Sequence, residues 1–357
     1  MRGVRRGLLF AVIGIALVGV VLASPASAAL TLFNSFTGNE GVSTDGCGST
    51  TATCTLQTLI PAGSTIQAAY LYSSAHVIST DPNGTTLTTL TQGQPQTITP
   101  AFTPLGINTG ANSGLQAWRA DVTSFVQSNA SIGALTTWTA NEGNKTAVID
   151  GEALVIVFSN PNRLTQTVFI LDGFARAVGD SAQVVTNPLP AGFIAQMLIG
   201  DGFSFDGGDP SAPTNNNQVS TIKVNGTTLT AVAGHCDDAQ DSCADGNLIT
   251  MGGTNAGTKT DPFTPFPNNA SVGSVSSDHE SYNLGNILSA GDTTINLTTF
   301  NTSLDDNIFV EVFDISGTAQ VNCEPNCNVP TPEPGSLVLL GAGLVGLGLY
   351  FRRGRRR

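Results

Sequence analysis

Short runs rich in Thr, Val, Ile and Phe, bounded by Gly, Pro, Asn or Asp, recur along this chain of 357 residues. Such runs, several with alternating apolar and polar positions, are typical of β-strands separated by turns. The runs in the first half are Leu30–Phe36, Thr65–Tyr72, Thr85–Leu90, Gln96–Phe102, Leu135–Thr139, Ala153–Phe158 and Thr167–Leu171. Those in the second half are Phe193–Ile199, Ser220–Val224, Thr227–Val232, Thr293–Thr299 and Ile308–Phe313. The pattern predicts an all-β protein, a β-sandwich or jelly roll, built as one large sandwich or two packed sandwiches.

Local patterns add detail to the predicted strands. Ile308–Phe313 alternates between two faces, as a half-buried strand does, whereas Leu154–Phe158 is uniformly apolar and is predicted to lie in the middle of a sheet. Asn83-Gly84 and Asn225-Gly226 are preferred dipeptides for tight hairpin turns. One helix is predicted at Asp121–Ser128, with Asp121 as its N-cap.

The N-terminal residues have the three parts of a secretory signal peptide. Arg2, Arg5 and Arg6 form a basic segment, Leu8–Leu22 is apolar, and Ala26-Ser27-Ala28 is a small-x-small cleavage site. We expect signal peptidase to cleave after Ala28. The Arg pair also fits a twin-arginine signal, but the long apolar segment favours the general secretory route.

The C-terminal residues combine a turn, an apolar segment and a basic end. Pro332, Glu333 and Pro334 precede the uncharged segment Gly335–Phe351. These 17 residues would span about 25 Å as a helix, the short end of what a bilayer accepts. The basic end consists of Arg352, Arg353, Arg355, Arg356 and Arg357. By the positive-inside rule it stays cytoplasmic, so the rest of the chain is predicted to lie outside.

This tail resembles the PEP-CTERM sorting signal of Gram-negative bacteria, through its Pro-Glu-Pro motif, apolar helix and terminal arginines. The resemblance implies recognition by an exosortase-like membrane protease, with cleavage near the Pro332-Glu333-Pro334 motif. It also implies transient attachment to the inner membrane, export to the cell surface or extracellular matrix, and association with exopolysaccharide. A plain C-terminal membrane anchor is the alternative.

The region between the two ends resembles bacterial and archaeal surface β-sandwich domains of unknown function. The resemblance is carried by Ile66–Tyr72, Arg119–Thr123, Gly151–Phe158 and Val168–Phe174, together with the late strand Ile308–Phe313. It implies no catalytic residue. The predicted divisions are a signal peptide (1–28), sandwich region 1 (29–180), sandwich region 2 or a continuation of the first (181–318), a linker (319–331) and the sorting tail (332–357) with its transmembrane helix (335–351).

The exported region is strongly acidic. Without the signal peptide and the tail, six basic and 25 acidic residues remain, a formal net charge of −19. Nucleic acid and anionic lipid are therefore excluded as expected partners, while a neutral glycan, a cation or a basic surface is compatible.

Six cysteines form three pairs close in sequence. In an exported chain such pairs indicate disulfide bonds rather than a metal site. The expected pairs are Cys47 with Cys54, Cys236 with Cys243, and Cys323 with Cys327. The last pair lies in the predicted linker, so bonds between molecules remain an alternative there.

Two acidic loops are candidate calcium sites, because Asp and Asn side chains supply the oxygen ligands that this cation prefers. The candidate ligands are Asp201, Asp206 and Asp209 in one loop and Asp237, Asp241 and Asp245 in the other. Neither loop has EF-hand spacing. The alternative is a solvated turn in which Asp and Gly serve backbone geometry.

Evidence for catalysis in the sequence is weak. Asp278-His279-Glu280 and His235 are candidate fragments of a hydrolase, but no GxSxG motif supplies a nucleophile. Tyr70 and Tyr72 share a strand face, which indicates core, and other aromatic residues permit carbohydrate binding without indicating it. We therefore expect a non-enzymatic structural or adhesive protein of an exopolysaccharide matrix. A carbohydrate-binding module is the second hypothesis and a secreted hydrolase the third.

Overall fold

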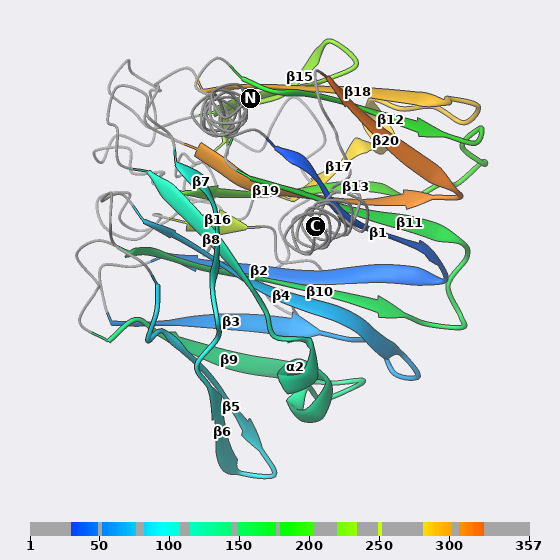
Figure 1. Cartoon of the computed structure of the whole chain (residues 1–357). Helices are drawn as coiled ribbons and strands as arrows, with labels where there is room; N and C mark the ends of the chain where they lie inside the picture. The colour runs from blue at the N-terminus through cyan, green and yellow to red at the C-terminus, as the bar shows by residue number, and fades with distance from the viewer. Residues whose placement is uncertain are drawn as a thin grey trace, which may run out of the picture.

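The body of the protein consists of four β-sheets stacked face to face (Figure 1). The computed structural model describes residues 30–48, 52–75, 82–107, 115–143, 149–173, 175, 179–202, 220–233, 249–251, 281–301 and 307–324. The predicted signal peptide and the sorting tail lie outside these residues. The all-β prediction is confirmed, because antiparallel strands account for most of the described chain.

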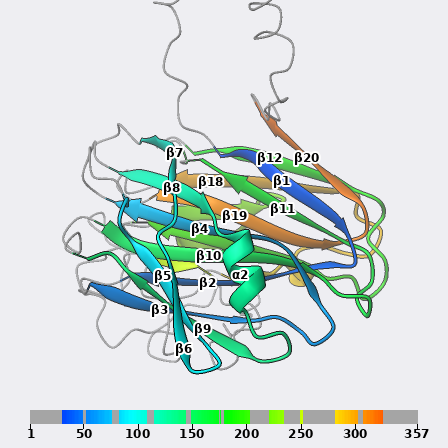
Figure 2. The same ribbon diagram turned by 60° about the horizontal axis from the view of Figure 1, so that its bottom comes forward.

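Sheets 1 and 2 come from the N-terminal half. Sheet 1 has the order β3-β9-β5-β6, formed by Thr53–Leu59, Leu135–Asn141, Thr86–Thr91 and Gln94–Ile98. Sheet 2 has the order β2-β10-β4-β8-β7, formed by Glu40–Gly48, Ile149–Ser159, Thr65–Ala75, Gln116–Asp121 and Thr103–Ile107. The helix α2, Thr123–Asn129, directly follows β8 and packs next to β4 (Figure 2).

Sheets 3 and 4 complete the stack. Sheet 3 has the order β1-β11-β19-β13-β16, formed by Thr31–Gly38, Gln166–Asp172, Asn307–Ser316, Ala195–Gly202 and Ile249–Met251. A further strand, β17 (Ser281–Asn283), pairs with β13 and leads into the short 3-10 helix η2 (Leu284–Asn286). Sheet 4 has the order β15-β14-β18-β12-β20, formed by Thr227–Ala233, Ser220–Val224, Thr294–Asn301, Ser181–Thr186 and Ala319–Glu324.

Sheet 3 draws strands from both sides of the predicted division near residue 180. Strands β1 and β11 precede that point, whereas β13 and β19 follow it, and β11 pairs with β19 along its whole length. In addition, the strand β20 occupies the first six residues of the predicted linker. One hydrogen-bonded sheet therefore links the two predicted regions.

Three apolar cores fill the spaces between successive sheets, so the central strands of the two inner sheets are buried on both faces. Leu56, Trp138 and Phe158 belong to the core between sheets 1 and 2, and Val155 and Val312 to the core between sheets 2 and 3. The third core, between sheets 3 and 4, includes Met197, Ile222 and Phe313.

This layering corrects the prediction of a half-buried strand at Ile308–Phe313. All six residues are buried, because β19 lies in the middle of an inner sheet with a core on each side. The prediction for Leu154–Phe158 is confirmed, since β10 pairs with β2 on one side and β4 on the other.

The two predicted Asn-Gly turns have different outcomes. Asn225-Gly226 joins β14 to β15 as a two-residue hairpin, with positive φ at both residues. Asn83-Gly84 forms a turn, closed by Thr85 N donating to Pro82 O at 2.9 Å, but it precedes β5 rather than joining two paired strands.

The strand β2 has no counterpart among the predicted strands, because its sequence is polar and rich in Gly. Its Ser43, Thr44 and Asp45 are nevertheless buried. Asp45 accepts a hydrogen bond from Gln57 N at 2.6 Å, and Ser43 accepts one from Leu59 N at 3.1 Å. Polar side chains of the edge strand β2 thus satisfy backbone donors of the edge strand β3 in the next sheet.

Candidate functional site

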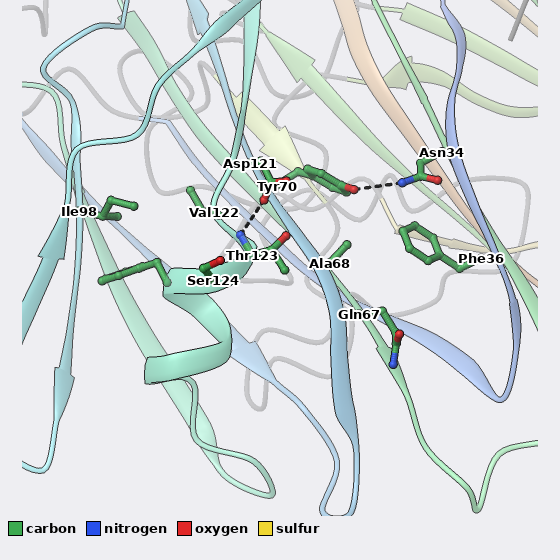
Figure 3. A pocket seen from close by; sticks show the side chains of 11 residues that line it. Asn34, Phe36, Gln67, Ala68, Tyr70, Ile98, Asp121, Val122, Thr123 and Ser124 are labelled. Carbon is green, nitrogen blue, oxygen red and sulfur yellow. Dashed lines mark hydrogen bonds between the residues drawn. The ribbon is translucent and has the colours of Figure 1, made fainter. Parts of the chain in front are cut away.

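An open groove with a volume of about 550 Å³ lies at one side of the stack. Its walls come from β1 of sheet 3, β4 and β8 of sheet 2, Ile98 of β6, and the start of α2 (Figure 3). Elements distant in the sequence therefore meet there. The volume lies within the roughly 300–1,000 Å³ of small-molecule sites.

Six polar side chains line this groove, those of Asn34, Gln67, Tyr70, Asp121, Thr123 and Ser124. Asn34 Nδ2 donates to the Tyr70 hydroxyl at 3.1 Å, which ties β1 to β4 (Figure 3). Asp121 and Gln67 are exposed at the groove. Gln67 also donates to Ser159 Oγ at 2.8 Å, so its amide orientation is fixed.

Asp121 has a different structural role from the one predicted. The helix begins at Thr123 and its N-cap residue is Val122, so the prediction that Asp121 is the N-cap is wrong. Asp121 is the last residue of β8, and its Oδ1 accepts a hydrogen bond from Thr123 N at 2.9 Å. That bond fixes the turn between β8 and α2 and orients the carboxylate at the groove (Figure 3).

Apolar side chains also line the groove. Phe36 of β1, Ile98 of β6 and Phe125 of α2 are each half-buried and line the groove. Among the described residues that line it, there is no Lys, Arg or His. The groove therefore combines apolar surface, hydrogen-bonding groups and a single carboxylate.

A buried ionic network holds β1 against sheet 2 beside the groove. Arg119 of β8 forms an ion pair with Asp172 of β11 and stacks on the Phe33 ring, with 3.3 Å from its Cζ atom to the ring centroid. The Tyr72 hydroxyl also donates to Asp172 Oδ2, at 3.0 Å. Phe33 in turn meets the Tyr70 ring edge to face, with centroids 5.0 Å apart.

The pKa values in this network follow from burial. Removal from water raises the pKa of Asp172, and Arg119 and the Tyr72 hydroxyl oppose part of that increase. Burial and the negative charge of Asp172 together raise the pKa of Tyr72 well above its usual value. Burial is also the main cause of the raised pKa of Tyr70. Both tyrosines therefore remain protonated hydrogen-bond donors at neutral pH.

Two further buried carboxyl groups lie on β19. Asp314 accepts a hydrogen bond from Arg163 Nη2 at 2.7 Å, yet burial outweighs this cation and raises the pKa of Asp314 to about 6. Glu311 is 1% exposed, and burial, reinforced by Asp180, raises its pKa to about 8. Both carboxyl groups thus belong to a strand inside the sheet stack rather than to a loop.

The structure describes only part of the predicted site residues. Cys47 and Cys54 form a disulfide, which confirms the first predicted pair. Cys323 lies in β20 opposite Ala182, whereas Cys236, Cys243 and Cys327 lie outside the described residues. Within the described residues, one group of three candidate metal-binding side chains occurs, formed by Cys47, Cys54 and Glu152. Because its two sulfur atoms are bonded to each other, it is a disulfide beside a carboxylate rather than a metal site.

The predicted calcium ligands are described at one position. Asp201 lies in β13 and is fully buried, so it belongs to an inner sheet rather than to a solvated turn. The remaining candidates, Asp206, Asp209, Asp237, Asp241 and Asp245, lie outside the described residues. The hydrolase candidates His235, Asp278, His279 and Glu280 also lie outside them.

Comparison with known proteins identifies the C-terminal end of the chain. Residues 330–357 match the PEP-CTERM protein-sorting motif. This match covers the predicted sorting residues from Pro332 to Arg357 and is consistent with an exosortase substrate. The motif indicates a secreted protein held transiently by a C-terminal membrane anchor, processed by an exosortase and by signal peptidase-type machinery.

The body of the chain has no such counterpart. No curated protein and no solved structure matches it. Within the part of the chain that the structure describes, no helix is both long and apolar enough to span a bilayer. Any role of the groove must therefore be inferred from its geometry alone.

Sequence reasoning did not find the groove. Its residues come from five elements. Two segments quoted for the resemblance to surface domains, Ile66–Tyr72 and Arg119–Thr123, contribute to the groove, but the sequence does not show that they lie together. The available signal was weak, namely Asp121 at the start of the predicted helix and Tyr70 in a strand otherwise assigned to the core. Only the pairing of β4 with β8, and the packing of β1 against them, brings these residues together.

Proposed function

We propose that this protein is a non-catalytic structural and adhesive component of an exopolysaccharide matrix, delivered by an exosortase-like system. The observation that carries the proposal is the sorting motif at residues 330–357, which directs the chain to the cell surface or extracellular space. The source cell is then an exopolysaccharide-producing bacterium of the Gram-negative type. The body supports this role with three apolar cores, a disulfide and buried ion pairs, which favour persistence outside the cell.

The acidic composition also supports a polysaccharide partner. The exported region has a formal net charge of −19, which disfavours binding to nucleic acid or anionic lipid and leaves a neutral polymer compatible. A carbohydrate-binding module with one defined ligand is the second candidate. The groove favours it, because aromatic rings, hydroxyl, amide and carboxylate groups lie together there.

The delivery step is tested by the intact mass of the protein recovered from the culture medium of the source cell. We expect a new N-terminus after Ala28 and a new C-terminus near Pro332. A chain that keeps Gly335–Arg357 and is found only in the membrane fraction would make it a stationary anchored protein.

The matrix role is tested by sedimentation with exopolysaccharide isolated from the same cells. We expect the protein to sediment with the polymer and to remain in the supernatant without it. A deletion strain should in addition form a matrix that sheds polymer more readily. A protein that stays in the supernatant at every polymer concentration would exclude the adhesive role.

A further inference from the structure

We propose that the groove formed by β1, β4, β8 and α2 is a binding site for a short neutral oligosaccharide. This inference rests on the proposed matrix function for the source of the sugar, but the site itself is argued from its geometry. Nothing in the sorting motif, which ends the chain at residues 330–357, points to the groove.

The polar groups of the groove provide both donors and acceptors, as sugar hydroxyls require. Tyr70 accepts a hydrogen bond from Asn34, which leaves the Tyr70 O–H and the second Asn34 N–H as donors toward a ligand. Asp121 uses Oδ1 for the backbone of Thr123, which leaves Oδ2 as an acceptor. The Asn34–Tyr70 pair lies on one side of Asp121 and α2 on the other (Figure 3).

The apolar groups of the groove suit the C–H faces of a sugar ring. Phe36 and Phe125 are half-buried, so each exposes part of an aromatic ring to the groove while packing against the core. Aromatic rings at ligand sites bury a large area at a small conformational cost, because few side-chain torsions are restricted. Polar groups between such rings distinguish this groove from a purely apolar docking surface.

The charge of the groove selects against ionic ligands. Asp121 is the single charged side chain among the described residues that line it, and it is negative. A phosphate, nucleotide or acidic sugar would meet repulsion without a compensating cation. A neutral saccharide forms the same hydrogen bonds without that cost.

The network beside the groove makes the site rigid before a ligand arrives. Phe33 lies between the Arg119 guanidinium and the Tyr70 ring, and Arg119 is held by the buried Asp172. The hydroxyl of Tyr70 is therefore fixed by its neighbours on β1 rather than by the ligand. A preorganised donor loses less conformational entropy on binding, so Arg119 is a positioning residue of the site.

The experiment uses the full chain, purified in a detergent without a sugar headgroup. Binding is measured on an array of neutral homo-oligosaccharides of two to six rings, with the acidic forms of the same sugars as competitors. The test variants are Phe36→Ala, which removes an aromatic face, and Gln67→Ala, which changes an exposed side chain and leaves the cores intact. The matched control is Phe300→Ala, since Phe300 is 42% exposed on β18 in sheet 4, away from the groove.

We expect wild type and Phe300→Ala to bind the same neutral oligosaccharide with affinities within about twofold. Phe36→Ala should weaken binding about tenfold or more, and Gln67→Ala by about two- to tenfold, as loss of a ring contact and of one hydrogen bond imply. Thermal unfolding of Gln67→Ala should match wild type, which separates loss of the site from loss of the fold.

The outcomes distinguish this inference from the matrix role. Groove variants that bind every oligosaccharide as wild type does, or a wild type that binds none, would overturn the groove site. Wild type that sediments with exopolysaccharide while the groove variants sediment equally would overturn it too and leave the matrix role standing. Array binding that is lost in the variants, without sedimentation, would support the groove and overturn the matrix role.

Discussion

Replacing Glu311 by Gln should remove a large part of the pH dependence of stability. Glu311 is buried between sheets 3 and 4 and has a pKa of about 8 in the folded protein, against an ordinary value of 4.5. Below pH 4.5 the carboxyl group is protonated in both the folded and the unfolded chain. Between pH 4.5 and 8 the unfolded chain loses this proton while the folded one keeps it, so the free energy of unfolding falls as pH rises.

The magnitude follows from the two pKa values. At about 1.4 kcal/mol per pH unit, the interval from 4.5 to about 8 corresponds to an upper limit of about 5 kcal/mol. Because a domain is stable by only about 5–15 kcal/mol, even a third of this limit is measurable. Gln is neutral and similar in size, so the variant keeps the stability that the wild type has only at low pH.

The assay is urea unfolding at pH values from 4 to 8, followed by the fluorescence of Trp118 and Trp138. Wild type and Glu311→Gln should have nearly equal free energies of unfolding at pH 4, and the variant should be more stable by at least about 1.4 kcal/mol at pH 8. Asp172 and Asp314 titrate in both proteins, so their contributions cancel in the difference. The control is Asp121→Asn, because Asp121 is exposed. If the free energy of unfolding had the same pH dependence in wild type and Glu311→Gln from pH 4 to 8, the reasoning would be refuted.

Other predictions concern single contacts. Arg119→Ala should lower the free energy of unfolding by about 2–3 kcal/mol in urea, because it leaves the buried Asp172 without its cation; an unchanged midpoint would contradict this. Replacing Cys47 and Cys54 by Ser should cost about 2–3 kcal/mol, and a reducing agent should destabilise the variant less than it destabilises wild type. Gly226→Ala should cost about 1 kcal/mol in the same assay, since φ is +76° in this hairpin turn; equal stability would mean that the turn relaxes.

Strand pattern and turn chemistry were sufficient to predict the fold class and most of the strands. Ser220–Val224 is predicted with its observed bounds, and the Asn225-Gly226 hairpin follows from the preference of that dipeptide for positive φ. The two-residue hairpin at Gln92-Gly93, between β5 and β6, also has positive φ at both residues. It contains no Asn, so the sequence did not predict it. Local signals thus predicted local structure where the residue types were distinctive.

Features that arise only when the sheets pack against one another could not be predicted from the pattern of apolar and polar residues. The sequence of the polar strand β2 resembles that of a loop. Its buried Ser43 and Asp45 accept hydrogen bonds from the backbone of β3, a partner that the sequence does not reveal. The alternation in Ile308–Phe313 predicted one solvent-exposed face, but a second apolar core covers that face. The groove was missed for the same reason, since Asn34 and Asp121 meet only after sheets 2 and 3 have packed.

The stacking of four sheets has a consequence for how the chain can vary over evolution. Side chains of β12 in an outer sheet alternate between exposed and buried, whereas every residue of β11 in an inner sheet is buried. Polar replacements should therefore be accepted at every second position of an outer strand such as β12 and at almost none of a central inner strand such as β11. Saturation mutagenesis of the whole chain would separate strands that tolerate polar substitutions at alternate positions from strands that tolerate almost none. Tolerance to substitution alone would then indicate which sheets are outer and which are inner.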